Sequence, residues 1–214
     1  MAFESEPLHR SVVIDTNALY SMPLADTLLR AADHELFEFA WTTEIMRELR
    51  ETMLRQGFPA NAIDRRIRAM QQAFRDSEVT GYEERIPQLL LPDPDDRHVL
   101  AAAIHAEARV IVTANVRDFP SDILAEHAIR ALTPADFLTG LIREFPRLLL
   151  EIVHEQAAAM RQPPLSFDAL VAKLTEYAPA FGAILRELET GERQASNQTA
   201  VPDVPSGDPL AGGY

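Results

Sequence analysis

The chain has 214 residues, of which 47% are hydrophobic and 25% charged, so its composition is that of a folded globular protein rather than a disordered or fibrous one. It has no cysteine, which excludes disulfides, thiolate zinc sites, iron–sulfur clusters and cysteine nucleophiles. Its 33 acidic and 20 basic residues give a net charge of −13, which argues against a protein that coats nucleic acid by bulk electrostatics. With neither a signal peptide nor an apolar run of roughly 20 residues, we expect a cytoplasmic protein with no membrane span.

The first third of the chain alternates between short apolar runs and amphipathic segments. The β-branched run 11–14 predicts a buried strand that ends at a polar turn, and apolar residues then recur at helical spacing from 24 to 32. The apolar run 36–41 predicts a second strand. Two further helices are expected, at 43–56 and from 59 to about 74, because a threonine cap, a glycine stop and a proline start mark their ends.

The same alternation continues after an irregular stretch. Asp93 and Pro94 have the chemistry of an N-cap and a first helical residue, and they predict a helix that runs to about residue 108. The continuous apolar run 109–113 is typical of a strand buried on both faces in a parallel sheet. Three shorter elements complete the pattern: a helix near 121–127, a strand at 129–132 and a helix that begins after Thr133.

These elements divide the chain into three parts. Alternating strands and helices over residues 1–140 predict an α/β fold, a three-layer domain with a parallel sheet. Residues 141–190 contain helical periodicity and no strand-like run, which predicts a small all-helical extension. Residues 191–214 are rich in Pro, Gly, Ser and Ala without apolar periodicity, so we expect them to form a disordered tail.

Basic residues gather in one window of this acidic chain. Between residues 47 and 75 there are seven arginines and three acids, and 19 of the 20 basic residues in the chain are arginine. Arginine suits bidentate contacts with phosphate, so the window predicts a surface that holds a substrate backbone; GC-rich codon usage is the alternative. The candidate phosphate-binding residues are Arg47, Arg50, Arg65, Arg66 and Arg68.

Two acids follow the strands expected at the centre of the sheet. Asp15 comes directly after the strand at 11–14, and Asp118 lies a few residues after the strand at 109–113. Ligands of open α/β sheets bind outside the carboxyl ends of the strands, so both acids are expected at one edge. Taken singly, each has the alternative of a simple helix cap or turn residue.

Two more acids are expected from helices that reach the same edge. Asp96 lies in the first turn of the helix that begins at Asp93, on the side that packs against the sheet. On the helix at 43–56, Glu48 falls beside the apolar stripe, whereas Glu44 and Glu51 turn towards solvent. We therefore select Asp96 and Glu48.

Four carboxylates at one edge imply a cation. Their mutual repulsion would raise their pKa values unless a positive charge neutralises them. Hard oxygen ligands without thiols favour Mg²⁺ or Mn²⁺, and such an ion activates water against a phosphodiester.

The segments 12–17, 43–49, 93–103 and 111–119 resemble, in this order, the motifs of the PIN domain, and the chain is similar to VapC-type toxins of bacterial toxin–antitoxin pairs. The helical extension resembles that of a longer VapC-like subgroup. The resemblance implies a Mg²⁺- or Mn²⁺-dependent endoribonuclease, often acting on tRNA or rRNA, that a partner antitoxin holds inactive. It leaves open whether the chain forms a homodimer.

Carried over by motif, the acidic site would consist of Asp15, Glu48, Asp96 and Asp118. The resemblance implies that the three aspartates are metal ligands and that Glu48 is a ligand or a base that orients water. Many family members have an acid two residues after the threonine of the last motif, where this chain has Asn115. The third position next to the metal therefore stays open between Asn115 and Asp118.

Neighbouring polar residues are expected to support this site. Thr16, Asn17 and Thr113, with Asn115, would hold carboxylates or backbone by hydrogen bonds, and plain turn chemistry is the alternative. His98 is expected on the helix surface, with a proton shuttle or a phosphate ligand as the alternative. Two other functions remain: a catalytically silent module that binds RNA or protein, and a phosphohydrolase of small molecules.

Overall fold

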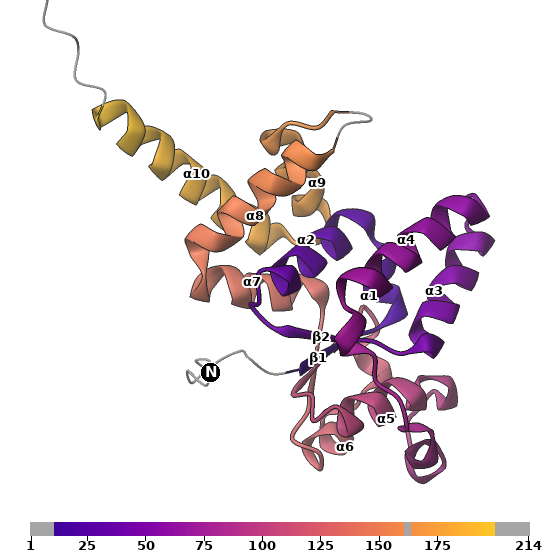
Figure 1. The fold of residues 1–214 in the computed structure, drawn as a ribbon. Coiled ribbons are helices and arrows are strands. Elements are labelled where there is room, and N and C mark those ends of the chain that lie inside the picture. Colours follow the sequence, from indigo (N-terminus) through magenta and orange to yellow (C-terminus); the bar gives the residue numbers. More distant parts are fainter. Residues whose placement is uncertain (1–10, 161–163, 200–214) are drawn as a thin grey trace, which may run out of the picture.

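In the computed structural model, which describes residues 11–160 and 164–199, a four-stranded parallel sheet lies at the centre of the first part of the chain (Figure 1). Its order is β2-β1-β3-β4, and every neighbouring pair is parallel. The central strands are fully enclosed because Val13, Ile14, Ile111 and Val112 expose none of their surface, as the continuous apolar runs predict. The strands are β1 Ser11–Ile14, β2 Glu38–Ala40, β3 Val110–Val112 and β4 Arg130–Leu132.

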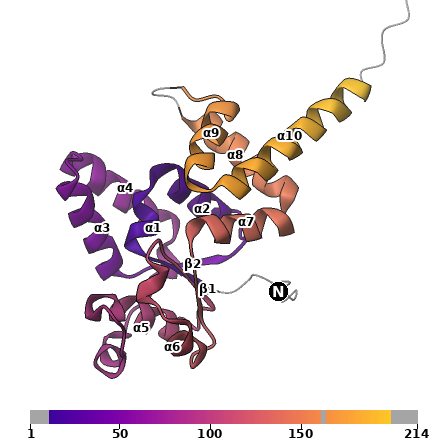
Figure 2. The same ribbon diagram turned by 180° about the vertical axis from the view of Figure 1, so that it is seen from behind.

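Helices cover both faces of this sheet. Figures 1 and 2 show α5 and α6 on one side of the strands and α2 and α7 on the other, so the predicted three-layer α/β domain is confirmed. The helices up to β4 are α1 Thr16–Tyr20, α2 Met22–Asp33, α3 Thr43–Arg55, α4 Ala60–Ala73, α5 Arg97–His105 and α6 Ser121–Ala125. Short 3-10 turns lie between them: η1 Arg75–Ser77, η2 Glu83–Gln88, η3 Pro94–Asp96 and η4 Val116–Asp118.

Side-chain caps fix where the helices near the sheet edge begin. The hydroxyl of Thr42 accepts from the backbone N–H of Ile45 at the start of α3, and Gly57, with a φ of +83°, follows its end. Asp93 caps η3 by accepting from the N–H of Asp95 at 2.9 Å, which confirms its predicted role as a cap. These caps set the entry points of the two helices that carry Glu48 and Asp96.

The C-terminal part is helical, as predicted, and shares a core with the sheet domain. It consists of α7 Pro134–Glu144, α8 Pro146–Ala159, α9 Phe167–Tyr177 and α10 Pro179–Thr199. The amide of the fully buried Gln156 on α8 accepts from the hydroxyl of Thr27 at 2.7 Å and donates to the carbonyl of Pro23 at 3.0 Å. The extension therefore meets α2 through buried polar contacts as well as apolar ones.

Three expected boundaries differ from the structure. The helix expected to reach residue 108 ends at His105, because Glu107 adopts a left-handed φ of +52°. The domain boundary expected at residue 140 lies inside α7. The prediction of a disordered tail from residue 191 is wrong for 191–199, which continue α10 with an Arg193–Glu189 pair at i,i+4 spacing; residues 200–214 lie outside the described part.

Within residues 11–160 and 164–199, no helix combines the length and the apolar character needed to cross a membrane.

Candidate functional site

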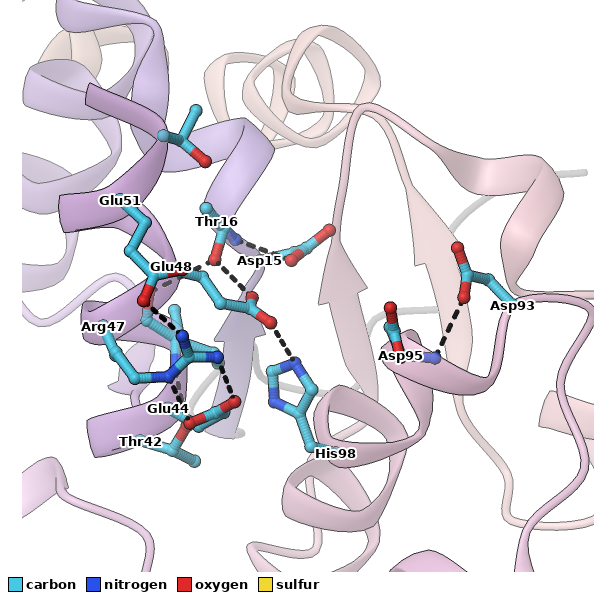
Figure 3. Close-up of polar contacts among 12 residues, drawn as sticks. Asp15, Thr16, Thr42, Glu44, Arg47, Glu48, Glu51, Asp93, Asp95 and His98 are labelled. Atoms are coloured by element: carbon cyan, nitrogen blue, oxygen red, sulfur yellow. Dashed lines mark hydrogen bonds and ion pairs between the residues drawn. The ribbon is translucent and has the colours of Figure 1, made fainter. Parts of the chain in front are cut away.

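Asp15 joins the sheet to the candidate site. Its backbone N–H donates to the carbonyl of Val112 at 2.9 Å, which extends the pairing of β1 with β3, and its side chain is only 3% exposed. One carboxylate oxygen accepts from the N–H of Thr16 at 2.6 Å (Figure 3), and the other accepts from the hydroxyl of Thr113 at 2.8 Å. Burial nevertheless raises the pKa of Asp15, more than these two hydrogen bonds lower it, and the nearby charge of Glu48 adds to the rise.

The loops that follow β1 and β3 are tied together. The side-chain oxygen of Asn17 accepts from the N–H of Ala114 at 2.7 Å and lies 3.2 Å from the hydroxyl of Thr113. That hydroxyl in turn accepts from the N–H of Asn115 at 3.1 Å. The hydrogen bonds expected of Thr16, Asn17 and Thr113 are therefore present, whereas Asn115 takes part through its backbone and its side chain is exposed.

Glu48 is the acid of α3 that turns towards Asp15. Its Oε2 lies 3.0 Å from the hydroxyl of Thr16, and its Oε1 lies 3.1 Å from the Nε2 of His98 (Figure 3). Glu44 and Glu51 instead pair with the guanidinium of Arg47 on the outer face of the helix. The choice made from the helical wheel is confirmed for the orientation of Glu48.

The pKa of Asp96 is affected by several neighbouring acids. Burial raises the pKa of Asp96 to about 7, and the charges of Asp15, Asp93 and Asp118 add to the rise, while His98 opposes it. Asp118 is therefore close enough for its charge to act on Asp96. Among the described residues, however, no three of His, Asp and Glu converge closely enough to enclose a metal ion.

His98 lies in the site, although the sequence analysis favoured a surface position for it. It is expected on the surface, but the structure buries it, leaving 7% of it exposed. Burial lowers the pKa of His98 because it disfavours the charged ring. The hydrogen bond and the negative charge of Glu48 raise the pKa by more, so the pKa is raised overall. The signal was present, because the apolar run 99–103 that follows leaves this end of α5 no solvent face.

The arginine window separates into three kinds of side chain. Arg47 pairs with Glu44 and Glu51, and Arg50 pairs with Asp64 at 2.8 Å, so their charges are partly neutralised on the surface. Arg66 is directed inward and donates to the carbonyl of Leu19 at 2.7 Å. It also lines an open groove of about 360 Å³ that is bounded by residues of α2, α4 and Phe74.

Arg65 and Arg68 are the exposed members of the candidate set on α4, and no ion pair involves either within the described residues. Their charges are therefore open to solvent.

Comparison with known proteins supports the architecture. The sequence pattern of the PIN domain matches residues 11–117, half of the chain and the whole stretch from β1 to the loop after β3. The chain belongs to the PIN-domain family. The pattern of the VapC50 C-terminal domain matches residues 134–187, from the start of α7 into the first part of α10, so the resemblance to a VapC-type protein with a C-terminal extension is confirmed.

One curated relative bears on function. Over 93 residues the chain is 39% identical to the protein of Mycobacterium tuberculosis named "Putative ribonuclease VapC50", a match that covers 44% of this chain and 55% of that protein. The match therefore spans about half of the relative's length. No solved structure matches this PIN-family chain.

The raised pKa of Asp96 leads to a test in protein without metal. An unfolded Asp has a pKa of about 3.9, so the folded chain binds this proton more tightly than the unfolded chain does, and stability falls as the pH rises from about 4 to 7. Asp96→Asn removes that loss. We expect the variant to melt at a higher temperature than the wild type at pH 8 and at the same temperature near pH 4, by thermal unfolding in EDTA. Asp95→Asn, at the exposed neighbour, is the control, and an equal gain at both pH values would contradict the electrostatic explanation.

Proposed function

We propose that this PIN-family chain is a metal-dependent endoribonuclease and the toxin of a type II toxin–antitoxin pair. The observation that carries the proposal is the crowding of acids at the carboxyl end of the sheet, where Asp15, Asp93 and Asp118 act on the pKa of Asp96. A cation at this edge would relieve that repulsion. The similarity to a protein named as a ribonuclease supports RNA as the substrate class.

The residues present fit Mg²⁺ or Mn²⁺. The donors are carboxylates, and these hard cations prefer oxygen. Mg²⁺ in particular keeps several waters and takes only one or two carboxylates from the protein, so its binding does not require three side chains to converge. One or two of Asp15, Asp96 and Asp118 would hold the ion directly and the remainder through its waters; when bound, it polarises phosphate oxygen and lowers the pKa of water.

The chain's own residues prepare this edge for a phosphodiester. The hydrogen bonds of Thr16 and Thr113 hold both oxygens of Asp15 in place, and each oxygen keeps a lone pair free for a cation. Glu48, 28% exposed at its side chain, lies where it can orient or deprotonate an attacking water. Arg65 and Arg68 would hold the RNA backbone. A partner antitoxin would keep the toxin inactive in the cytoplasm.

Substitution of single acids tests the proposed activity. We expect Asp15→Asn and Asp96→Asn to abolish cleavage of total cellular RNA in Mg²⁺ or Mn²⁺, because each removes a charge that would hold the ion, while both variants stay folded by circular dichroism. Glu48→Gln should lower the rate strongly, whereas Glu44→Gln, one turn earlier on α3, should not. A folded wild-type protein that leaves all RNA intact with either metal would overturn the ribonuclease and favour a silent binding module.

Thermal unfolding tests the metal without a substrate. If the dissociation constant is in the millimolar range, about ten times that concentration of Mg²⁺ stabilises the fold by RT ln 11, roughly 1.4 kcal/mol. This corresponds to a rise of about 3 to 6 °C in Tm. The rise should exceed that in NaCl of equal ionic strength, which screens the net charge of −13 without binding, and should vanish in Asp15→Asn. Equal shifts in the two salts would contradict a metal site.

The exposed arginines can be separated from the rest by salt dependence. Arg65→Gln combined with Arg68→Gln should weaken binding of single-stranded RNA and reduce the slope of log K against log salt by about 0.7 for each phosphate that is no longer neutralised. The control is Arg143→Gln with Arg147→Gln, an equal change of charge at two exposed positions outside the window. Equal effects of the two double variants in fluorescence-anisotropy titrations would show that only net charge matters.

A further inference from the structure

His98 occupies an unusual position for a histidine beside an acidic edge. It lies at the start of α5, two residues after Asp96, and its Nε2 is 3.1 Å from Oε1 of Glu48. The two partners come from different helices, 50 positions apart in the sequence, so the contact is tertiary and does not arise from local helix geometry. Figure 3 shows the ring directed from α5 towards the Glu48 carboxylate.

The surroundings of Nδ1, the second ring nitrogen, limit what His98 can contact. Nδ1 is buried and has no hydrogen-bond partner among the described residues. Nε2 is committed to Glu48, so neither nitrogen faces solvent where a phosphate or a leaving group would arrive. Nε2 carries a proton in both the charged ring and the neutral tautomer that satisfies this contact, so the donor to Glu48 is the same in either state.

Glu48 needs such a donor. Its side chain has three rotatable bonds and is partly exposed. The Thr16 hydroxyl that contacts Oε2 has a single proton, and its oxygen also lies 3.2 Å from the carbonyl oxygen of Ile45, so the proton is shared between two acceptors. A second donor on Oε1 fixes the plane of the carboxylate. Because Val99 and Leu100 next to His98 are fully buried, the backbone that carries this donor is held firmly in the core.

We propose that His98 is a positioning residue that holds the Glu48 carboxylate in place beside Asp15. It acts through Glu48 and does not itself touch RNA or transfer a proton. The importance of this contact for turnover rests on the proposed ribonuclease function, but the contact itself can be tested without any activity.

The kinetic test uses an oligonucleotide that spans a cleavage site mapped by end sequencing of digested total RNA. His98→Leu keeps the bulk and removes the donor, and we expect kcat to fall about 10- to 100-fold, as is typical when a group that orients an active-site side chain is removed, with KM little changed. His98→Gln keeps an N–H at the ε position and should recover most of kcat. His105→Leu, at the exposed end of the same helix, is the control and should match the wild type.

Recovery by glutamine supports positioning. A folded His98→Gln variant as impaired as His98→Leu would overturn the proposal in favour of a role that only imidazole can fill, and unimpaired activity in both would overturn it outright.

A measurement without substrate separates this proposal from the function on which it rests. In protein labelled with ¹⁵N at histidine, the His98 signal, assigned by its disappearance in His98→Gln, should show a protonated Nε2 whose hydrogen exchanges slowly, and Glu48→Ala should shift it and speed the exchange. An unprotonated Nε2, or a signal indifferent to Glu48→Ala, overturns the positioning role. If the wild type cleaves no RNA, the ribonuclease fails and this spectrum alone decides whether His98 holds Glu48.

Discussion

The repulsion between carboxylates at the end of a parallel sheet is the constraint on which the rest of the site depends. Asp15 cannot move away from it, because its backbone continues the hydrogen bonding of β1 with β3 while its side chain lies buried at the start of α1. Hydrogen-bond donors surround both carboxylates. Asp15 accepts from the Thr16 amide and the Thr113 hydroxyl, and the adjacent Glu48 is contacted by the Thr16 hydroxyl and His98. Those donors offset only part of the cost, which is why the pKa of Asp15 is still raised.

The fold could be predicted from the sequence wherever one local signal decides an element. The short, β-branched apolar runs at 11–14 and 109–113 indicated enclosed strands, and the structure contains both. Asp93 and Thr133 mark helix starts with cap chemistry that is present in the structure. The end of α10 was missed, because composition suggested disorder while the spacing of Arg193 and Glu189 favoured another turn of helix. Composition averages over a segment and cannot detect such a pair.

The direction of Glu48 and the hydrogen bonds of Thr16 and Thr113 could be predicted from the sequence, whereas the donor His98 could not. Glu48 could be chosen over Glu44 and Glu51 because helical periodicity gives direction, and the structure agrees. The burial of His98 was indicated by the apolar run 99–103, but its contact with Glu48 was not, because Glu48 lies on another helix. Arg66 was misjudged because a basic residue in a basic window looks like part of a surface. In both cases the deciding contact joins residues distant in sequence, which no local pattern encodes.

The buried amide of Gln156 has a consequence for how the extension is mounted. Apolar contacts are non-directional, so two purely apolar helix faces specify their alignment less strictly than a buried hydrogen bond does. Thr27 and Pro23 supply the one donor and one acceptor that this amide meets, and any other alignment would leave buried polar groups unpaired at a cost of about 1 to 3 kcal/mol each. These hydrogen bonds therefore fix one alignment of the helical extension on α2. A ligand that binds the outer face of α2 would contact a surface formed jointly by the sheet domain and the extension.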